Sequence, residues 1–193
     1  VYECKSCTEK FNASFVAQLG HSFVNGVCSV CGAKNPFVDI DAKGRHIYFT
    51  DAILWAAEKG ITTGTSETTF EPDGTCTRAQ VVTFLWRLAG QPEPKGQASA
   101  FTDVRNDQYY SKAVAWAAEK GITTGTSETT FEPGATVTRA QFVTFLWRYL
   151  DRPVSGGFGV FADVSSSHFA CSAILWAYEN GITSGTSATT FEP

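Results

Sequence analysis

The sequence predicts a mainly α-helical protein made of helix–loop–helix repeats, preceded by a short cysteine-containing segment. The stretch WAAEKGITTGTSETTFEP begins at Trp55 and again at Trp116, and a variant, WAYENGITSGTSATTFEP, begins at Trp176. Self-similarity at a fixed period of this size is typical of repeat architectures. With 193 residues and 43% hydrophobic residues, the chain can bury a core of ordinary domain size.

Each repeat opens with Phe-x-Asp followed by Ile or Val, and continues into an Ala-rich segment that predicts a first helix. Gly60, Gly121 and Gly181 follow these segments, where a helix end favours a residue that tolerates positive φ. The polar, β-branched segment ITTGTSETTFEP then predicts an ordered loop.

Two sets of residues in this part of the repeat are candidates for ligand contacts. The aspartates are Asp39, Asp103 and Asp163, and the tryptophans are Trp55, Trp116 and Trp176. The alternative for the aspartates is a turn or cap that holds the entry to the first helix. The tryptophans could be platforms for sugar rings, although an aromatic residue on an Ala-rich helical face more often belongs to the core.

The second helix of the repeat is predicted to start at Thr-Arg-Ala-Gln. Thr77 with Gln80, and Thr138 with Gln141, match a capping box, in which each side chain satisfies a backbone donor of the other. Polar residues form only a narrow stripe on these segments, so the helices must be covered on most sides and belong near the middle of a bundle.

Pro-, Gly- and Ser-rich stretches at 89–100 and 152–160 separate the repeats. The chain therefore divides into a cysteine module at 1–36 and repeats at 37–90, 101–151 and 161–193. The third repeat has its first helix and loop but no Thr-Arg-Ala-Gln segment, which predicts an uncovered binding edge and apolar surface there. The chain starts at Val1 and contains no Met, as expected of a processed or excised fragment.

Arg78 and Arg139 each occupy the first position of a predicted second helix, where the helix dipole is already positive. An arginine at this position is unfavourable for the stability of the helix, but it suits an anion site. The free N–H groups and the guanidinium can together hold a carboxylate. The alternative is that each arginine pairs with a nearby acid, such as the Glu of the Phe-Glu-Pro turn, and only fixes the loop.

The cysteine module has the pattern C-x2-C-x20-C-x2-C, formed by Cys4, Cys7, Cys28 and Cys31. Two such pairs suit tetrahedral coordination of a structural zinc ion, and GVCSVCGAK resembles a zinc-ribbon knuckle. The rival interpretation is two disulfides, which an extracellular protein would favour. A segment this short needs one of these constraints to fold.

Charge and hydropathy exclude two classes of partner. The net charge is −4 and no basic stripe is present, which argues against nucleic-acid binding. No apolar run approaches the ~18 residues that a membrane helix needs, so no membrane insertion is expected.

The repeats resemble the S-layer homology family of bacterial surface proteins over residues 37–193. The resemblance rests on the Phe-x-Asp-Val, GIT(T/S)GT…TFEP and TRAQ(F/V)VTFLWR motifs. It implies three motifs packed as a pseudo-threefold helical bundle, with grooves between motifs that bind secondary cell-wall polymers, often pyruvylated glycans linked to peptidoglycan. It also implies an extracellular, cell-wall location. Gln80 and Gln141 depart from the family's usual Glu, which leaves the identity of the glycan open.

The leading functional hypothesis is therefore a non-catalytic module that anchors a surface protein to an acidic wall polysaccharide through Arg78 and Arg139. The alternative is a structural or protein-interaction scaffold whose repeats pack against another chain or self-associate. An enzyme is disfavoured, because no nucleophile–His–acid arrangement is visible in the sequence.

Overall fold

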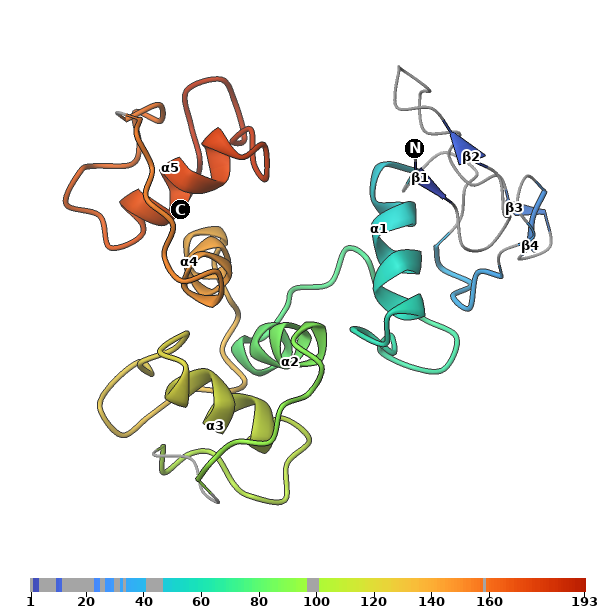
Figure 1. Ribbon diagram of the computed structural model, residues 1–193, viewed down its shortest axis with the longest axis horizontal. Helices are drawn as coiled ribbons and strands as arrows, with labels where there is room; N and C mark the ends of the chain where they lie inside the picture. Colours follow the sequence, from blue (N-terminus) through green and yellow to red (C-terminus); the bar gives the residue numbers. More distant parts are fainter. Residues whose placement is uncertain are drawn as a thin grey trace. The chain divides into compact units, whose positions relative to one another are not determined.

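A computed structural model describes residues 2–3, 10–11, 23–24, 27–29, 32, 34–40, 47–96, 101–157 and 159–193. The chain forms two compact units, Val1–Gly74 and Thr75–Pro193. Helices make up most of the regular secondary structure among the described residues, as predicted for a mainly α-helical fold (Figure 1). No helix among them combines the length and apolar character that crossing a bilayer requires.

The first unit contains helix α1 (Ile47–Glu58) and two short antiparallel hairpins. The hairpins pair β1 (Tyr2–Glu3) with β2 (Lys10–Phe11), and β3 (Phe23–Val24) with β4 (Val27–Cys28). The buried core next to α1 consists of Phe37, Ile40 and Ile53.

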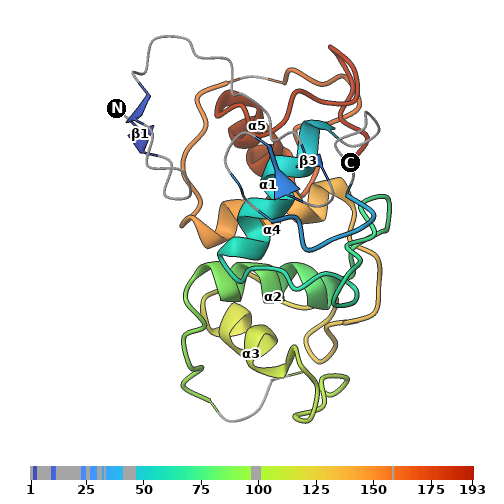
Figure 2. The same cartoon turned by 90° about the vertical axis from the view of Figure 1, so that its right-hand side faces the viewer.

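The second unit contains α2 (Arg78–Leu88), α3 (Ser111–Glu119), α4 (Arg139–Tyr149) and α5 (Cys171–Glu179). Helix α2 packs on α3, α4 packs on α5, and α2 also packs on α4 (Figures 1 and 2). The second helix of one repeat thus pairs with the first helix of the next repeat. This pairing explains why α2, which is part of the first repeat in sequence, lies in the second unit. The predicted pseudo-threefold bundle stays a prediction.

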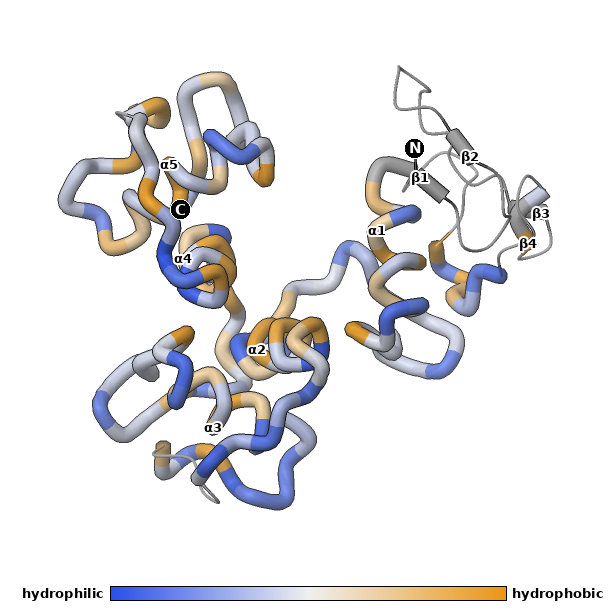
Figure 3. Tube along the Cα trace, in the orientation of Figure 1, coloured by the Kyte–Doolittle hydropathy of each residue, from blue (hydrophilic) through white to orange (hydrophobic). Residues whose placement is uncertain are grey.

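The narrow polar stripe predicted that the second helix is covered on most sides, and α2 is covered in this way. Val81, Val82 and Leu85 are buried in a core shared with α3, and Figure 3 shows the hydrophobic character of this helix. Even the polar Thr83 is buried, and its hydroxyl donates to the Ala79 carbonyl at 2.7 Å. A buried hydroxyl that is satisfied within its own helix avoids the cost of desolvation without a partner.

The predicted helix starts are confirmed. The Thr77 N–H donates to Gln80 Oε1 at 2.7 Å, and the Gln80 N–H donates to Thr77 Oγ1 at 3.3 Å. Thr138 and Gln141 form the same capping box at the start of α4. The predicted helix ends are confirmed as well, because Gly60, Gly121 and Gly181 all have positive φ.

The loop that follows each first helix is ordered, as predicted. In the second repeat the Ser127 hydroxyl lies 2.6 Å from Thr130 Oγ1 and accepts the Thr130 N–H at 3.1 Å. Gly125 has φ 80°, and a Cβ there would collide with the backbone carbonyls of Ser127 and Thr130. The glycine of this motif is therefore required by both its conformation and the close approach of the chain.

Replacing the cap residue tests the capping box. We expect Thr138→Ala to lower the free energy of unfolding by about 1 kcal/mol, because the Gln141 N–H loses its acceptor. Urea denaturation measures the change, and Thr138→Ser, which keeps the hydroxyl, should stay close to the unaltered chain. An equal loss in both variants would contradict a capping role for the hydroxyl.

Candidate functional site

The aspartate of each Phe-x-Asp motif binds the backbone of the Phe-Glu-Pro turn in the same repeat. In the third repeat, Asp163 accepts the Phe191 N–H at 2.9 Å and the Glu192 N–H at 2.7 Å. Asp39 and Asp103 form the corresponding bonds in the other repeats. Each aspartate lies in a turn, as the alternative expected, and its carboxylate also holds the far end of the loop. Their predicted role in ligand binding stays a prediction.

These bonds stabilise an unusual backbone conformation and the charged form of the carboxylate. Glu192 has φ 57°, which is uncommon for a residue with a side chain and is held here by its N–H bond to Asp163. Hydrogen bonds from Glu192 and Phe191 lower the pKa of the Asp163 carboxyl, since they favour the ionised form.

Arg78 is buried and extends into the following repeat. Its Nε donates to the Phe131 carbonyl at 2.8 Å, and its guanidinium lies over the rings of Phe131 and Phe145, 4.8 and 5.4 Å from their centroids. The residue is 4% exposed, and its buried Nη2 has no hydrogen-bond partner in the protein. Burial lowers the pKa of Arg78, and the negative charges of Glu132 and Asp103 oppose this shift.

Arg139 repeats this arrangement in a more open setting. Its Nε donates to the Phe191 carbonyl at 2.9 Å and its guanidinium lies 4.7 Å from the Phe191 ring centroid, but the residue is exposed. Both arginines fix a Phe-Glu-Pro turn, as the structural alternative expected. The group that they bind is the phenylalanine carbonyl, whereas the sequence suggested the glutamate carboxylate.

The free N–H groups that the anion-site hypothesis required are occupied at α2. The Arg78 N–H donates to the Ala135 carbonyl at 2.9 Å, and the Ala79 N–H donates to the Pro133 carbonyl at 3.1 Å. A chain segment of the next repeat therefore fills the place where a carboxylate was expected at α2. Whether Arg78 and Arg139 also contact a ligand, together with their cap residues Thr77, Gln80, Thr138 and Gln141, stays a prediction.

The three tryptophans differ in exposure. Trp55 is 50% exposed, whereas Trp116 and Trp176 are 4% and 5% exposed and belong to the core, as the structural alternative expected. Trp116 has a second feature, because its indole N–H is buried without a hydrogen-bond partner in the protein. An unpaired buried donor is costly and calls for an explanation.

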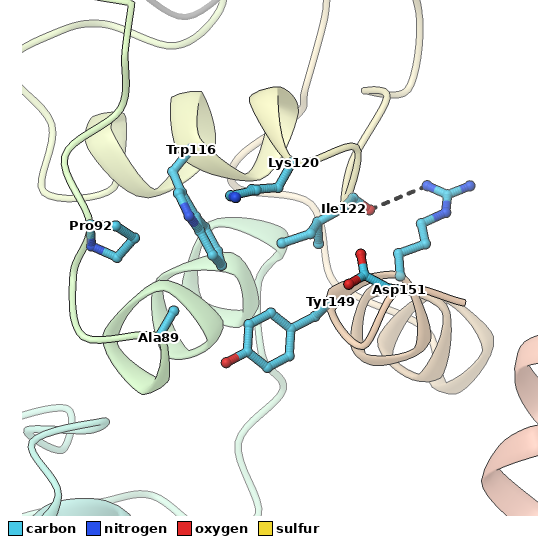
Figure 4. Close-up of a pocket in the computed structure, with 8 residues that line it drawn as sticks. Ala89, Pro92, Trp116, Lys120, Ile122, Tyr149 and Asp151 are labelled. Carbon is cyan, nitrogen blue, oxygen red and sulfur yellow. Dashed lines mark hydrogen bonds between the residues drawn. The ribbon is translucent and has the colours of Figure 1, made fainter. Parts of the chain in front are cut away.

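Trp116 lines a pocket of about 320 Å³ at the ends of α2, α3 and α4 (Figure 4). Trp116 reaches into it from α3 and Lys120 from the position directly after α3, and Tyr149 and Asp151 approach from the end of α4. Arg148 also lines the pocket and donates to the Ile122 carbonyl at 3.3 Å, and Ala89 and Pro92 complete the wall.

The pocket combines aromatic surface with positive charge. The Trp116 and Tyr149 rings lie 6.1 Å apart between centroids. Burial lowers the pKa of Arg148, and the neighbouring charge of Arg152 adds to this effect. Apolar walls with a few charged groups are typical of ligand pockets. Sequence reasoning missed Lys120, Tyr149 and Arg148, although the repeated Trp-Arg before each linker places an arginine at this helix end.

The zinc prediction falls on Cys4, Cys7 and Cys31, which lie outside the described residues, and on Cys28, which is described only as part of β4. Within the described ranges, no group of His, Cys, Asp and Glu residues could hold a metal ion. Zinc binding and the rival disulfides both stay predictions.

The fold defines a module of tandem helix–loop–helix repeats, with a pocket at the ends of α2, α3 and α4. The model of the S-layer homology domain matches residues 37–82, 100–143 and 160–193. The chain therefore belongs to the S-layer homology family, which places it at the bacterial cell surface.

Similar proteins include surface proteins and enzymes. An S-layer protein of Bacillus thuringiensis subsp. finitimus is 28% identical over 96% of this chain and 23% of its own length. A cellulosome-anchoring protein of Acetivibrio thermocellus is 29% identical over 67% of the chain and 28% of its own length. An endoglucanase of Bacillus sp. (strain KSM-635) is 36% identical over 54% of the chain but only 11% of its own length. The chain thus spans less than a third of each of these relatives.

The two arginines form a matched pair for a stability test. We expect Arg78→Ala to lower the free energy of unfolding by about 2–3 kcal/mol, because it leaves a buried carbonyl without its charged donor. Arg139→Ala should cost only about 0.5–1 kcal/mol, since its exposed partners can bind water. Chemical denaturation compares the two variants, and equal losses would contradict the difference in burial.

The Asp163 carboxyl predicts a measurable pH dependence. Because its pKa is lowered in the folded chain, the stabilisation is present above the unfolded pKa of about 3.9 and is lost as the pH falls through the folded pKa. We expect a carboxyl titration by NMR to have its midpoint below about 3.9. Stability curves should show that Asp163→Asn removes this part of the pH dependence. A midpoint at or above the ordinary value would contradict the bonding to Phe191 and Glu192.

Proposed function

We propose that this chain fixes a bacterial surface protein to the cell wall without a covalent bond, by binding an acidic, pyruvylated secondary cell-wall polysaccharide. The proposed site is the pocket formed by Trp116, Lys120, Arg148, Tyr149 and Asp151. Family membership supports the location and the anchoring role, and one relative is named for anchoring a cellulosome.

The observation that carries the proposal is the chemistry of the pocket. Lys120 and Arg148 supply two cations against the single carboxylate of Asp151, and such cations form strong charge-assisted hydrogen bonds with a carboxylate. A pyruvyl ketal places a carboxylate and a methyl group on a sugar ring. The half-buried Tyr149 ring, which lies 6.1 Å from the buried Trp116 ring between centroids, suits the apolar part of that group.

In this proposal the features that recur in each repeat shape the site, while the pocket residues contact the glycan. Arg78 and Asp103 hold the loop that follows α3, and the pocket is built from α3 and its two neighbouring helices. Trp55, with its half-exposed ring, is retained as a proposed sugar contact in the first unit. Several weak sites on one polymer would raise the overall avidity.

Removing the Lys120 charge tests the site. We expect Lys120→Ala to weaken binding of purified wall polysaccharide on the order of tenfold or more, because a charge-assisted hydrogen bond is lost. Isothermal titration calorimetry measures the affinity. Lys112→Ala is the matched control, since Lys112 on the same helix pairs with Glu93 in solvent at 2.7 Å and does not line the pocket.

A second arm identifies the ligand group. Polysaccharide stripped of pyruvate by mild acid should bind the unaltered chain about as weakly as the Lys120 variant binds the intact polymer. Full affinity of Lys120→Ala for the intact polymer would overturn the proposed site. Full affinity of the unaltered chain for the stripped polymer would overturn the proposed ligand group.

A further inference from the structure

Helix α2 ends in a Schellman motif, in which two N–H groups after the helix donate back to carbonyls of its last turn. The Gly90 N–H donates to the Arg87 carbonyl at 3.0 Å, and the Gln91 N–H donates to the Trp86 carbonyl at 2.9 Å. Gly90 has φ 84°, which lies in the left-handed region that glycine adopts most readily. Glycine is therefore the residue that this position of the motif favours.

Helix α4 ends in the same motif, but Asp151 stands at the position of Gly90. The Asp151 N–H donates to the Arg148 carbonyl at 3.1 Å, and the Arg152 N–H donates to the Trp147 carbonyl at 2.9 Å. Asp151 has φ 61°, so a residue with a side chain adopts the conformation that glycine adopts in α2. This conformation is unfavourable for a residue with a Cβ, and a negative charge is unfavourable at the C-terminal end of a helix.

The Asp151 side chain has no structural partner that would offset this disadvantage. Among the described residues, its carboxylate accepts no hydrogen bond, and it forms no ion pair with Lys120 or Arg148 although both line the same pocket. Arg78 and Arg139 also occupy unfavourable positions at a helix end, but each guanidinium donates to a backbone carbonyl. Asp151 differs from these arginines, because no bond in the described part of the chain accounts for its charge.

The pocket is the feature that the Asp151 side chain faces. Figure 4 shows its carboxylate turned toward Ile122, whereas the Lys120 side chain lies beside Trp116. The pocket therefore has an anionic acceptor on one side and a cation on the other. Asp151 is exposed, so a ligand can reach it, and an ionised carboxylate forms strong hydrogen bonds with hydroxyl donors.

We propose that Asp151 is the specificity-determining residue of this pocket. Its carboxylate accepts hydroxyl groups of a sugar and excludes ligands that bring a second negative charge to this side. The inference rests on the proposed function, in which Lys120 and Arg148 bind the ligand's carboxylate. That carboxylate then lies on the cationic side, while neutral hydroxyl groups of the same sugar face Asp151.

A ligand that is negatively charged along its whole length meets a different environment. Polyglycerol phosphate carries a phosphodiester on every unit, so an anion bound by Lys120 is followed by a second anion near Asp151. Like charges repel more strongly in a partly enclosed site than in bulk water. Such repulsion is a common way to reject a competing ligand.

Asp151→Gly gives α4 the residue that α2 has and tests the proposal by isothermal titration calorimetry. We expect the affinity for purified wall polysaccharide to fall on the order of tenfold, because a charged acceptor is lost. The affinity for polyglycerol phosphate should rise on the order of tenfold, because the repulsion is removed. Asp107→Gly is the matched control, since it removes the same charge from a residue that pairs with Arg105 at 2.7 Å and does not line the pocket.

The melting temperature separates a role in specificity from a role in stability. We expect Asp151→Gly to keep the melting temperature or raise it by about 2–4 °C, since glycine is preferred at this position. A lower melting temperature would overturn the proposal, because the carboxylate would then stabilise the end of α4. Asp151→Asn, which keeps an oxygen acceptor without the charge, should also gain affinity for polyglycerol phosphate.

Failure of this inference and failure of the proposed function give different results. If Lys120→Ala weakens binding while Asp151→Gly keeps the ratio of affinities for the two polymers, the proposed function stands and the role of Asp151 is overturned. If Lys120→Ala keeps full affinity for the wall polysaccharide, both are overturned. The predicted result is a loss of affinity in Lys120→Ala together with a change in the ratio on the order of a hundredfold in Asp151→Gly.

Discussion

The arrangement of the second unit depends on an arginine that donates from the start of one helix to a backbone carbonyl in the next repeat. Arg78 reaches the Phe131 carbonyl while Asp103 accepts the N–H groups of Phe131 and Glu132, so one turn is held from both sides. A buried guanidinium is tolerated here because it is bonded and lies between two rings. Repetition of this clamp by Arg139, Phe191 and Asp163 couples each repeat to its neighbour.

This coupling has a consequence for function. Since the second helix of each repeat packs on the first helix of the next, a pocket at the helix ends contains residues from two repeats. Ala89 comes from the end of the first repeat and Pro92 from the linker after it, whereas Trp116, Lys120, Arg148 and Tyr149 come from the second repeat. Ligand binding in this pocket would therefore depend on the clamp formed by Arg78, although the ligand would not touch it. Loss of Arg78 would weaken binding by changing the geometry of the pocket.

The helix starts and helix ends could be predicted from sequence because they depend on residues that are close together in the chain. The capping boxes at Thr77 and Thr138 and the glycine helix ends follow from chemistry within three or four residues. The partner of Asp163 could not be found this way, because its bonds to Phe191 and Glu192 cross 28 and 29 residues. The pocket was missed for the same reason, since Lys120 and Arg148 reach one pocket only because α3 and α4 both pack on α2. The sequence marks Arg78 and Arg139 as cations at the start of a helix, where a positive charge is unfavourable. It cannot show that each guanidinium donates to a backbone carbonyl.

The most direct test is a crystal structure of the chain with a pyruvylated wall disaccharide. The account predicts the ligand carboxylate within hydrogen-bond distance of Lys120 Nζ, while Arg78 Nε remains bonded to the Phe131 carbonyl. A structure in which the guanidinium of Arg78 leaves that carbonyl and binds the carboxylate would contradict it.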